Sequence, residues 1–161
     1  MIKVLILDVD GVMTDGSIIY DNEGKEYKKF NVRDGFGIRL LKEMGIEVVI
    51  ISGRTSNTTT IRAKELGIKE VYQGVGDKLA LYEQLKMKNR WDDNEVAFIG
   101  DDINDVDLMK RVGISATTQD SFDYVKNDAQ IVIPVGGGKG AVRYFIDYIM
   151  GLNKKWEKLR K

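Results

Sequence analysis

Short runs of apolar residues recur along the chain and predict the strands of a buried sheet. The runs are KVLIL at 3–7, EVVII at 47–51, EVAFI at 95–99 and AQIVI at 129–133, with a weaker run at 70–72. An unbroken apolar run of this kind is typical of a strand that is covered on both faces. Such strands belong to parallel sheets, because the connecting helices pack on both sides.

Apolar residues at helical spacing separate these runs. Ile38, Leu41 and Met44 share one helix face ahead of Gly45, and glycine commonly follows the last turn of a helix. The other groups with this spacing are Ile61 and Leu66 before Gly67, Leu81 with Leu85, and Val142 with Ile146, Ile149 and Met150. Alternating strands and helices predict an α/β fold, a three-layer Rossmann-like parallel sheet with helices on both faces.

One segment interrupts the alternation directly after the first strand. Residues 17–20 and 26–30 have the pattern of two strands, and DNEG at 21–24 between them is typical of a hairpin turn. We therefore expect a β-hairpin that protrudes from the working edge of the sheet. Exposed apolar residues on a hairpin favour association with a partner. Those of this hairpin are Ile18, Ile19, Tyr20 and Phe30.

The composition is that of one soluble globular domain. The chain has 161 residues, 43% of them hydrophobic and 31% charged, and we expect residues 1–161 to form a single domain. Lys plus Arg and Asp plus Glu both number 25, so the formal net charge is zero. A nonspecific nucleic-acid binder normally carries a basic excess, so this balance disfavours a nucleic-acid partner. The basic tail NKKWEKLRK at 153–161 is expected to be solvated.

The absence of cysteine and histidine restricts the chemistry that the chain can perform. Disulfides, thiolate metal sites and imidazole catalysis are excluded, so an acid or base must be a carboxylate, a lysine or a tyrosine. A metal site with oxygen ligands alone favours a hard cation, with Mg²⁺ as the first candidate. We find no signal peptide and no apolar run near the roughly 20 residues of a membrane span, and we expect a cytoplasmic protein without a membrane partner.

Polar residues follow the predicted strands at the points where ligands bind in an open parallel sheet. Asp8 and Asp10 follow the first strand, Ser52-Gly53-Arg54 the second, and GDD at 100–102 the run at 95–99, while Lys78 begins a predicted helix. Two neighbouring carboxylates repel each other unless a positive group lies close by. Each motif alone is typical of a turn or a helix cap. Their joint occurrence at strand ends indicates one catalytic site.

These motifs, in this order, resemble the four motifs of the haloacid dehalogenase superfamily of aspartate-nucleophile phosphatases. Nearly the whole chain resembles one subfamily, the 3-deoxy-manno-octulosonate 8-phosphate phosphatases. The closer resemblance is carried by DVDGVMTDG, the hairpin, FNVRDGFGIRLL, IISGR, GDDINDVDLM and VGGGKGAVR. Of these, NVRDG and GGGKGAVR are not required by the superfamily chemistry. The resemblance implies a Mg²⁺-dependent phosphatase of this sugar-acid phosphate, without a separate cap domain.

The resemblance also implies a role for each motif residue. Asp8 would attack the phosphorus and form an aspartyl phosphate, and Asp10 would protonate the departing sugar oxygen and later activate a water. Ser52 would hydrogen-bond a phosphoryl oxygen, and Lys78 would neutralise one. The implied Mg²⁺ site consists of Asp8, the Asp10 backbone carbonyl and Asp101, with Asp102 orienting a metal-bound water or Lys78.

A substrate pocket at the base of the hairpin is implied in the same way. A sugar acid carries a carboxylate besides its phosphate, and the planar fork of arginine suits that group. The implied substrate-binding residues are Asp10, Asn31, Val32, Arg33, Asp34, Gly35, Arg39, Arg54, Arg62, Lys78 and Asn104. The subfamily further implies a homotetramer associated through the hairpins, in which GGGKGAVR at 136–143 reaches a neighbour's active site, and a product that enters lipopolysaccharide synthesis.

Three other functions are open. The chain could be a phosphatase of a nine-carbon ulosonate 9-phosphate. A signalling receiver domain also combines an acidic pair, Mg²⁺ and a lysine, but its phosphorylated aspartate follows a middle strand, where this chain has Ser52. A catalytically silent tetrameric module of the same fold is the third, although every residue that the chemistry needs is present.

Overall fold

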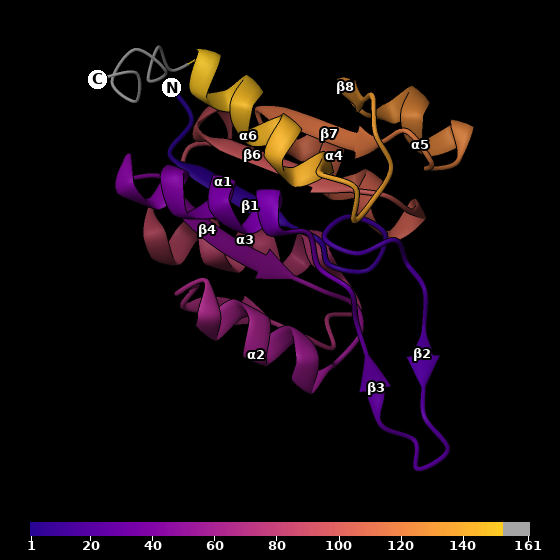
Figure 1. Cartoon of the computed structure of the whole chain (residues 1–161). Helices are drawn as coiled ribbons and strands as arrows, with labels where there is room; N and C mark the ends of the chain where they lie inside the picture. Colours follow the sequence, from indigo (N-terminus) through magenta and orange to yellow (C-terminus); the bar gives the residue numbers. More distant parts are fainter. Residues whose placement is uncertain (153–161) are drawn as a thin grey trace.

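The computed structural model describes residues 1–152, so the basic tail at 153–161 lies outside the described residues. Figure 1 shows a central sheet with helices on both sides. Six strands form this parallel sheet, in the order β5-β4-β1-β6-β7-β8. They are β1 (Val4–Leu7), β4 (Glu47–Ile51), β5 (Glu70–Tyr72), β6 (Val96–Gly100), β7 (Ile114–Thr118) and β8 (Ile131–Ile133). The predicted three-layer α/β fold is confirmed.

Successive residues of each strand point to opposite faces of the sheet and enter two separate cores. Leu5 and Leu7 of β1 lie in the first core, whereas Val4 and Ile6 lie in the second. Helices α1 (Val32–Glu43), α2 (Asn57–Glu65) and α6 (Ala141–Leu152) cover the first core, and α3 (Lys78–Asn89), α4 (Val106–Arg111) and α5 (Asp123–Asp128) cover the second. Within residues 1–152, none of the helices has both the length and the apolar character that crossing a bilayer requires.

Most of the predicted elements lie where the apolar pattern places them. β4 and β5 have the predicted bounds, whereas β6 begins one residue later and β8 is confined to Ile131–Ile133. One of the apolar residues that indicate these helices does not lie in the core. Ile61 of α2 is 59% exposed, and the buried residues of this helix are Thr59 and Ala63.

The apolar pattern does not predict β7, α4 or α5. β7 reads ISATT, and its residues Ser115, Thr117 and Thr118 are buried although they are polar. The Thr117 hydroxyl donates to the Gly100 carbonyl oxygen at 2.9 Å, which satisfies it inside the core. α4 and α5 have six residues each, too few to show a helical repeat.

The predicted hairpin protrudes from the sheet at the carboxyl ends of its strands (Figure 1). β2 (Ile19–Tyr20) and β3 (Glu26–Tyr27) pair antiparallel over fewer residues than predicted. The Asp21 carboxylate closes the turn by accepting two backbone N–H groups. Phe30 is not exposed as expected, because it packs half-buried against the first core. The exposed apolar residues of the hairpin are Ile18, Ile19, Tyr20 and Tyr27.

Candidate active site

The motifs predicted to be catalytic meet at the carboxyl ends of the three central strands. β1 lies between β4 and β6, and Asp8, Ser52 and Asp101 each follow one of these strands directly. Residues from far apart in the sequence meet there because parallel strands end at the same edge of the sheet. A pocket of 220 Å³ at this edge is lined by Asp8, Asp10, Ser52, Gly53, Arg54, Asp101, Asp102 and Asn104.

Lys78 is a buried cation between two carboxylates. It is the first residue of α3, which Asp77 caps by accepting a backbone N–H. Its Nζ donates to Asp8 Oδ1 at 2.7 Å and to Asp105 Oδ1 at 2.5 Å, and its side chain is 1% exposed. Burial lowers the pKa of Lys78, but the charges of Asp8 and Asp105 outweigh this and raise it above the ordinary value. Lys78 is therefore charged at neutral pH.

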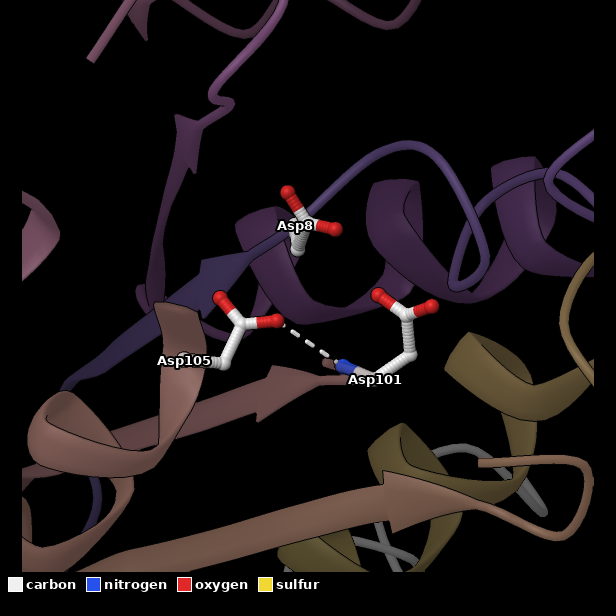
Figure 2. Close-up of side chains that lie close together, drawn as sticks. All are labelled: Asp8, Asp101 and Asp105. Atoms are coloured by element: carbon white, nitrogen blue, oxygen red, sulfur yellow. Dashed lines mark hydrogen bonds between the residues drawn. The ribbon is translucent and has the colours of Figure 1, made fainter. Parts of the chain in front are cut away.

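Three carboxylates form a cluster that is suited to a metal ion (Figure 2). One oxygen from each of Asp8, Asp101 and Asp105 lies within 4.8 Å of the other two. Asp105 ends the 3-10 turn η2 (Ile103–Asp105) after β6, and its Oδ2 accepts the Asp101 backbone N–H at 2.9 Å. The predicted ligand set contains Asp102 and omits Asp105. The repeated acids in GDDIND at 100–105 could have pointed to Asp105.

The raised pKa values in this cluster indicate that cationic side chains do not fully compensate the negative charges of its carboxylates. Burial and the charge of Asp105 raise the pKa of Asp8 to about 6, against the attraction of Lys78. Burial and the charge of Asp8 raise the pKa of Asp101 to about 9. No cationic side chain within residues 1–152 forms an ion pair with Asp101. A donor set made only of carboxyl oxygens fits a hard divalent cation such as Mg²⁺, whose charge would favour the ionised form of Asp101.

The loop after β1 depends on glycine at two close approaches. Gly11 has a φ of +90°, and a Cβ at this position would lie 2.0 Å from Asp101 Oδ2. The glycine-rich loop at 136–140 packs on the same segment, since a Cβ on Gly137 would lie 2.0 Å from the Gly11 carbonyl oxygen. The glycine-rich loop thus supports the loop after β1 of the same chain. Its extension into a neighbour's active site stays a prediction.

Asp10 lies between two cations. Lys28 Nζ contacts Asp10 Oδ1, and Arg54 Nη1 lies 3.6 Å from the same oxygen. Glu26 of β3 accepts from Arg54 Nη2 at 2.7 Å, and its Oε1 lies 3.6 Å from Lys28 Nζ. The hairpin therefore supplies Glu26 and Lys28 to the site, and the sequence reasoning missed both. Lys28 belongs to the stretch KEYKK at 25–29, in which nothing distinguishes one lysine from another.

The NVRDG segment begins α1 at the base of the hairpin. Asn31 caps the helix by accepting a backbone N–H at 2.9 Å, and its amide donates to the glycine-rich loop at 3.2 Å. Val32 and Arg33 are exposed, whereas Asp34 is buried. Asp34 Oδ1 accepts the Arg143 backbone N–H of α6 at 2.7 Å. Asp34 thus connects α1 with α6, and the half-buried Asn31 connects it with the glycine-rich loop.

The predicted arginines lie in different surroundings. Arg54 lines the pocket, and its buried Nη1 has no hydrogen-bond partner among the described residues. Arg39 is exposed on α1. Arg62 lies against Gly35, where a Cβ would be 2.4 Å from its Nη2, and it donates to the Asn31 carbonyl oxygen at 3.4 Å. These contacts are those of a side chain that supports the start of α1.

Asp102 and Asn104 line the pocket from the turn after β6. The Asp102 carboxylate caps this turn by accepting the Ile103 N–H at 2.7 Å, and it also accepts the Tyr124 hydroxyl at 3.2 Å. The place predicted for Asp102 beside Lys78 is taken by Asp105, because η2 turns the Asp105 side chain back over the end of β6.

Comparisons with known proteins give relatives over nearly the whole chain. A family model described as haloacid dehalogenase-like hydrolase matches residues 32–113. The 3-deoxy-D-manno-octulosonate 8-phosphate phosphatase of Yersinia pestis is 44% identical over 156 residues, which make up 97% of this chain and 83% of that protein. Its crystal structure has a TM-score of 0.94 to this chain, and the match covers 97% of this chain and 84% of that one.

Two further solved structures contain ligands. The 3-deoxy-D-manno-octulosonate 8-phosphate phosphatase of Moraxella catarrhalis, in complex with a magnesium ion, a phosphate ion and a KDO molecule, has a TM-score of 0.95 at 36% identity, covering 98% of this chain and 91% of that one. The cobalt-bound form of the Haemophilus influenzae phosphatase has a TM-score of 0.89 at 39% identity, and the match covers 93% of this chain and 88% of that one. The chain therefore belongs to the haloacid dehalogenase-like hydrolases and, within them, to the family of the 3-deoxy-D-manno-octulosonate 8-phosphate phosphatases.

Proposed function

We propose that this protein is a Mg²⁺-dependent phosphatase that converts 3-deoxy-D-manno-octulosonate 8-phosphate to the free sugar acid and phosphate. The observation that carries the proposal is the meeting of Asp8, Asp101 and Lys78 at one edge of the sheet. The Yersinia pestis relative is named for this substrate, and the Moraxella catarrhalis relative binds magnesium, phosphate and KDO. Family membership also argues against a signalling receiver domain.

In the first chemical step, Asp8 attacks the phosphorus of the substrate. A bond forms between its carboxylate oxygen and phosphorus while the bond from phosphorus to the sugar oxygen breaks, which yields an aspartyl phosphate. Asp10 donates its proton to the departing sugar oxygen. Lys78 holds the Asp8 carboxylate through Oδ1 at 2.7 Å. Ser52 and Lys78 stabilise the negative charge on the phosphoryl oxygens.

In the second step, water hydrolyses the aspartyl phosphate. Asp10 is now a carboxylate and takes a proton from the water as the water oxygen attacks the phosphorus. The bond from phosphorus to Asp8 breaks, so Asp8 returns to a carboxylate and phosphate is released. Asp10 is then protonated again and ready for the next substrate.

Three residues are proposed to hold Mg²⁺. Asp8 and Asp101 would do so through their carboxylates and Asp10 through its backbone carbonyl. Asp105 is placed to orient Asp8 and Asp101, because it contacts Lys78, which donates to Asp8, and accepts the Asp101 N–H. A bound Mg²⁺ supplies positive charge against the anionic phosphoryl group and nucleophile. The fit rests on the carboxylate cluster and on the raised pKa of Asp101.

Arg54 is the proposed partner of the carboxylate of the sugar acid. Its Nη1 is buried without a hydrogen-bond partner among the described residues, and a buried donor of this kind is stabilised by an acceptor. A guanidinium also matches the planar geometry of a carboxylate. Arg33, exposed at the start of α1, is proposed as a second contact.

The proposal extends to the assembly and its location. We propose a single domain without a cap, in the cytoplasm, that forms a homotetramer through the hairpins. Support for the tetramer comes from the exposure of Ile18 at 56%, Ile19 at 48% and Tyr20 at 58%. Clustered apolar side chains of this kind are typical of an interaction surface.

A substrate panel tests the proposed activity. Phosphate release is measured with Mg²⁺ from the eight-carbon sugar-acid phosphate, from a nine-carbon ulosonate 9-phosphate and from simple phosphate esters. We expect kcat/KM for the eight-carbon compound to exceed the others by at least about tenfold, or about 1.4 kcal/mol. Preference for the nine-carbon compound would support the rival phosphatase, and no turnover of any compound would support a catalytically silent module.

A further inference from the structure

Lys28 is a residue of the hairpin, yet its ammonium group is buried at the catalytic site. Its side chain is 1% exposed, its Nζ contacts Asp10 Oδ1, and Glu26 Oε1 lies 3.6 Å away. The neighbouring Lys29 has a side chain that is 76% exposed. A buried ammonium is unfavourable unless carboxylates compensate it, so the position of Lys28 is set by these two partners.

Glu26 in turn ties this pair to the body of the protein. Its carboxylate contacts the Ser56 hydroxyl and accepts from Arg54 Nη2 at 2.7 Å, and its backbone carbonyl accepts from the Thr58 hydroxyl at 3.4 Å. Ser56 and Thr58 belong to the start of α2. Lys28 therefore bridges a carboxylate that is anchored on α2 and the carboxylate of Asp10, which lines the pocket.

We propose that Lys28 is a positioning residue that fixes the Asp10 carboxyl group in the pocket and thereby couples leaving-group protonation to the placement of the hairpin. Both cations lie on the Oδ1 side of this carboxyl group, since Lys28 Nζ contacts Oδ1 and Arg54 Nη1 lies 3.6 Å from the same oxygen. The inference rests on the proposed function, in which Asp10 protonates the sugar oxygen. Proton transfer needs donor and acceptor within hydrogen-bond reach, and a misplacement of about 1 Å costs on the order of 100-fold in rate.

Two leaving groups of different basicity test this role. A sugar alkoxide needs a proton to depart, whereas 4-nitrophenolate departs without one. The first chemical step is measured as pre-steady-state release of each leaving group at saturating substrate with Mg²⁺. Lys28→Met should slow sugar release by about tenfold or more and change 4-nitrophenol release by less than about threefold. The substrate concentration that gives half of the maximal rate should stay within about twofold of the original value.

Matched variants show whether the charge and its position matter. Lys28→Arg keeps a cation and should restore sugar release to within about threefold of the original rate. Lys29→Met alters the adjacent exposed lysine and should leave both release rates unchanged. Circular dichroism checks folding, and Lys28→Gln, with the same expected result, replaces Lys28→Met if that variant is unfolded.

An equal loss with both leaving groups would overturn the inference, because it would show that Lys28 supports the fold alone. Weaker binding at an unchanged rate would overturn it too, because Lys28 would then bind substrate. Asp10→Asn separates this test from the proposed function. If Asp10→Asn discriminates between the leaving groups and Lys28→Met does not, the role of Lys28 alone is wrong. If Asp10→Asn does not discriminate, the proposed acid role of Asp10 is wrong and the inference with it.

Discussion

Lys78 shows how one ammonium group organises the centre of the site. It contacts Asp8 from the end of β1 and Asp105 from the turn after β6, and all three side chains are buried. Removing one partner from a buried ion pair typically costs about 3–5 kcal/mol, since the remaining charges lose their compensation. The same contact favours the ionised form of Asp8 that its proposed role as nucleophile requires, so we expect its loss to affect both stability and catalysis.

Replacing Lys78 should therefore weaken the fold as well as the reaction. For Lys78→Met we expect the free energy of unfolding to fall by about 3 kcal/mol at neutral pH without Mg²⁺. Denaturant unfolding measures this change, with Lys88→Met, an exposed lysine of the same helix, as the control. Unchanged stability in Lys78→Met would contradict the structural role assigned to this lysine.

Asp8 is expected to be indispensable for turnover. Asp8→Asn keeps the size of the side chain but removes the attacking carboxylate, and we expect kcat to fall by at least about 1000-fold while the circular dichroism spectrum is retained. The matched control is Asp107→Asn, an exposed carboxylate of α4, which should be fully active. Substantial activity in a folded Asp8→Asn variant would show that another group is the nucleophile.

At the scale of elements, Asp34 connects two helices that cover the first core. It lies in the first turn of α1 and accepts the Arg143 backbone N–H at the start of α6. Burial raises its pKa from 3.8 to about 6, although the Arg143 N–H and the charges of Arg62 and Arg143 oppose this. The folded protein thus binds this proton more tightly than the unfolded chain.

This raised pKa gives a pH dependence of known sign. Between about pH 4 and pH 6 the folded state holds more protons at Asp34, so the contribution of this group to stability falls as the pH rises through that window. Asp34→Asn keeps the acceptor for the Arg143 N–H but cannot ionise. In denaturant unfolding, the free energy of unfolding of the variant minus that of the original protein should increase as the pH rises from about 4 to about 7. A pH-independent difference between the two would contradict this account.

The sequence predicts the elements that have an unbroken apolar signal, and it also predicts which residues stand at their ends. β1, β4 and β6 are buried on both faces, so the apolar pattern assigns Asp8, Ser52 and Asp101 to one edge of the sheet. β7 could not be predicted, because its buried hydroxyl groups are satisfied only by tertiary hydrogen bonds such as that from Thr117.

Residues whose importance depends on side-chain direction were missed or assigned less surely. Asp105 reaches Lys78 because η2 turns it back over β6, whereas the family resemblance implied this place for Asp102, three residues earlier. Lys28 and Lys29 are adjacent in the sequence, but only Lys28 is buried at the site. Arg62, which the resemblance implies as a substrate contact, lies against Gly35 and donates to the Asn31 carbonyl oxygen, and its contact with substrate stays a prediction.

At the scale of the whole molecule, the hairpin should determine the oligomeric state. Sedimentation at micromolar concentration should show a tetramer, and Ile19→Lys should shift it towards smaller species, because a charge in an apolar contact is unfavourable. Ile61→Lys is the matched control, since Ile61 is also exposed, at 59%, but lies on α2. A monomer at this concentration would contradict the assembly through the hairpins.

The central claim concerns the whole fold: two distant stretches of chain gather a divalent cation beside a nucleophilic carboxylate. A single-turnover reaction with 3-deoxy-D-manno-octulosonate 8-phosphate labelled in its phosphate, quenched in acid and digested, tests this most directly. We predict label on the peptide that contains Asp8, and we predict that it forms with Mg²⁺ and is lost with a chelator or in Asp101→Asn. Label on another residue, or equal labelling without a divalent cation, would contradict the account.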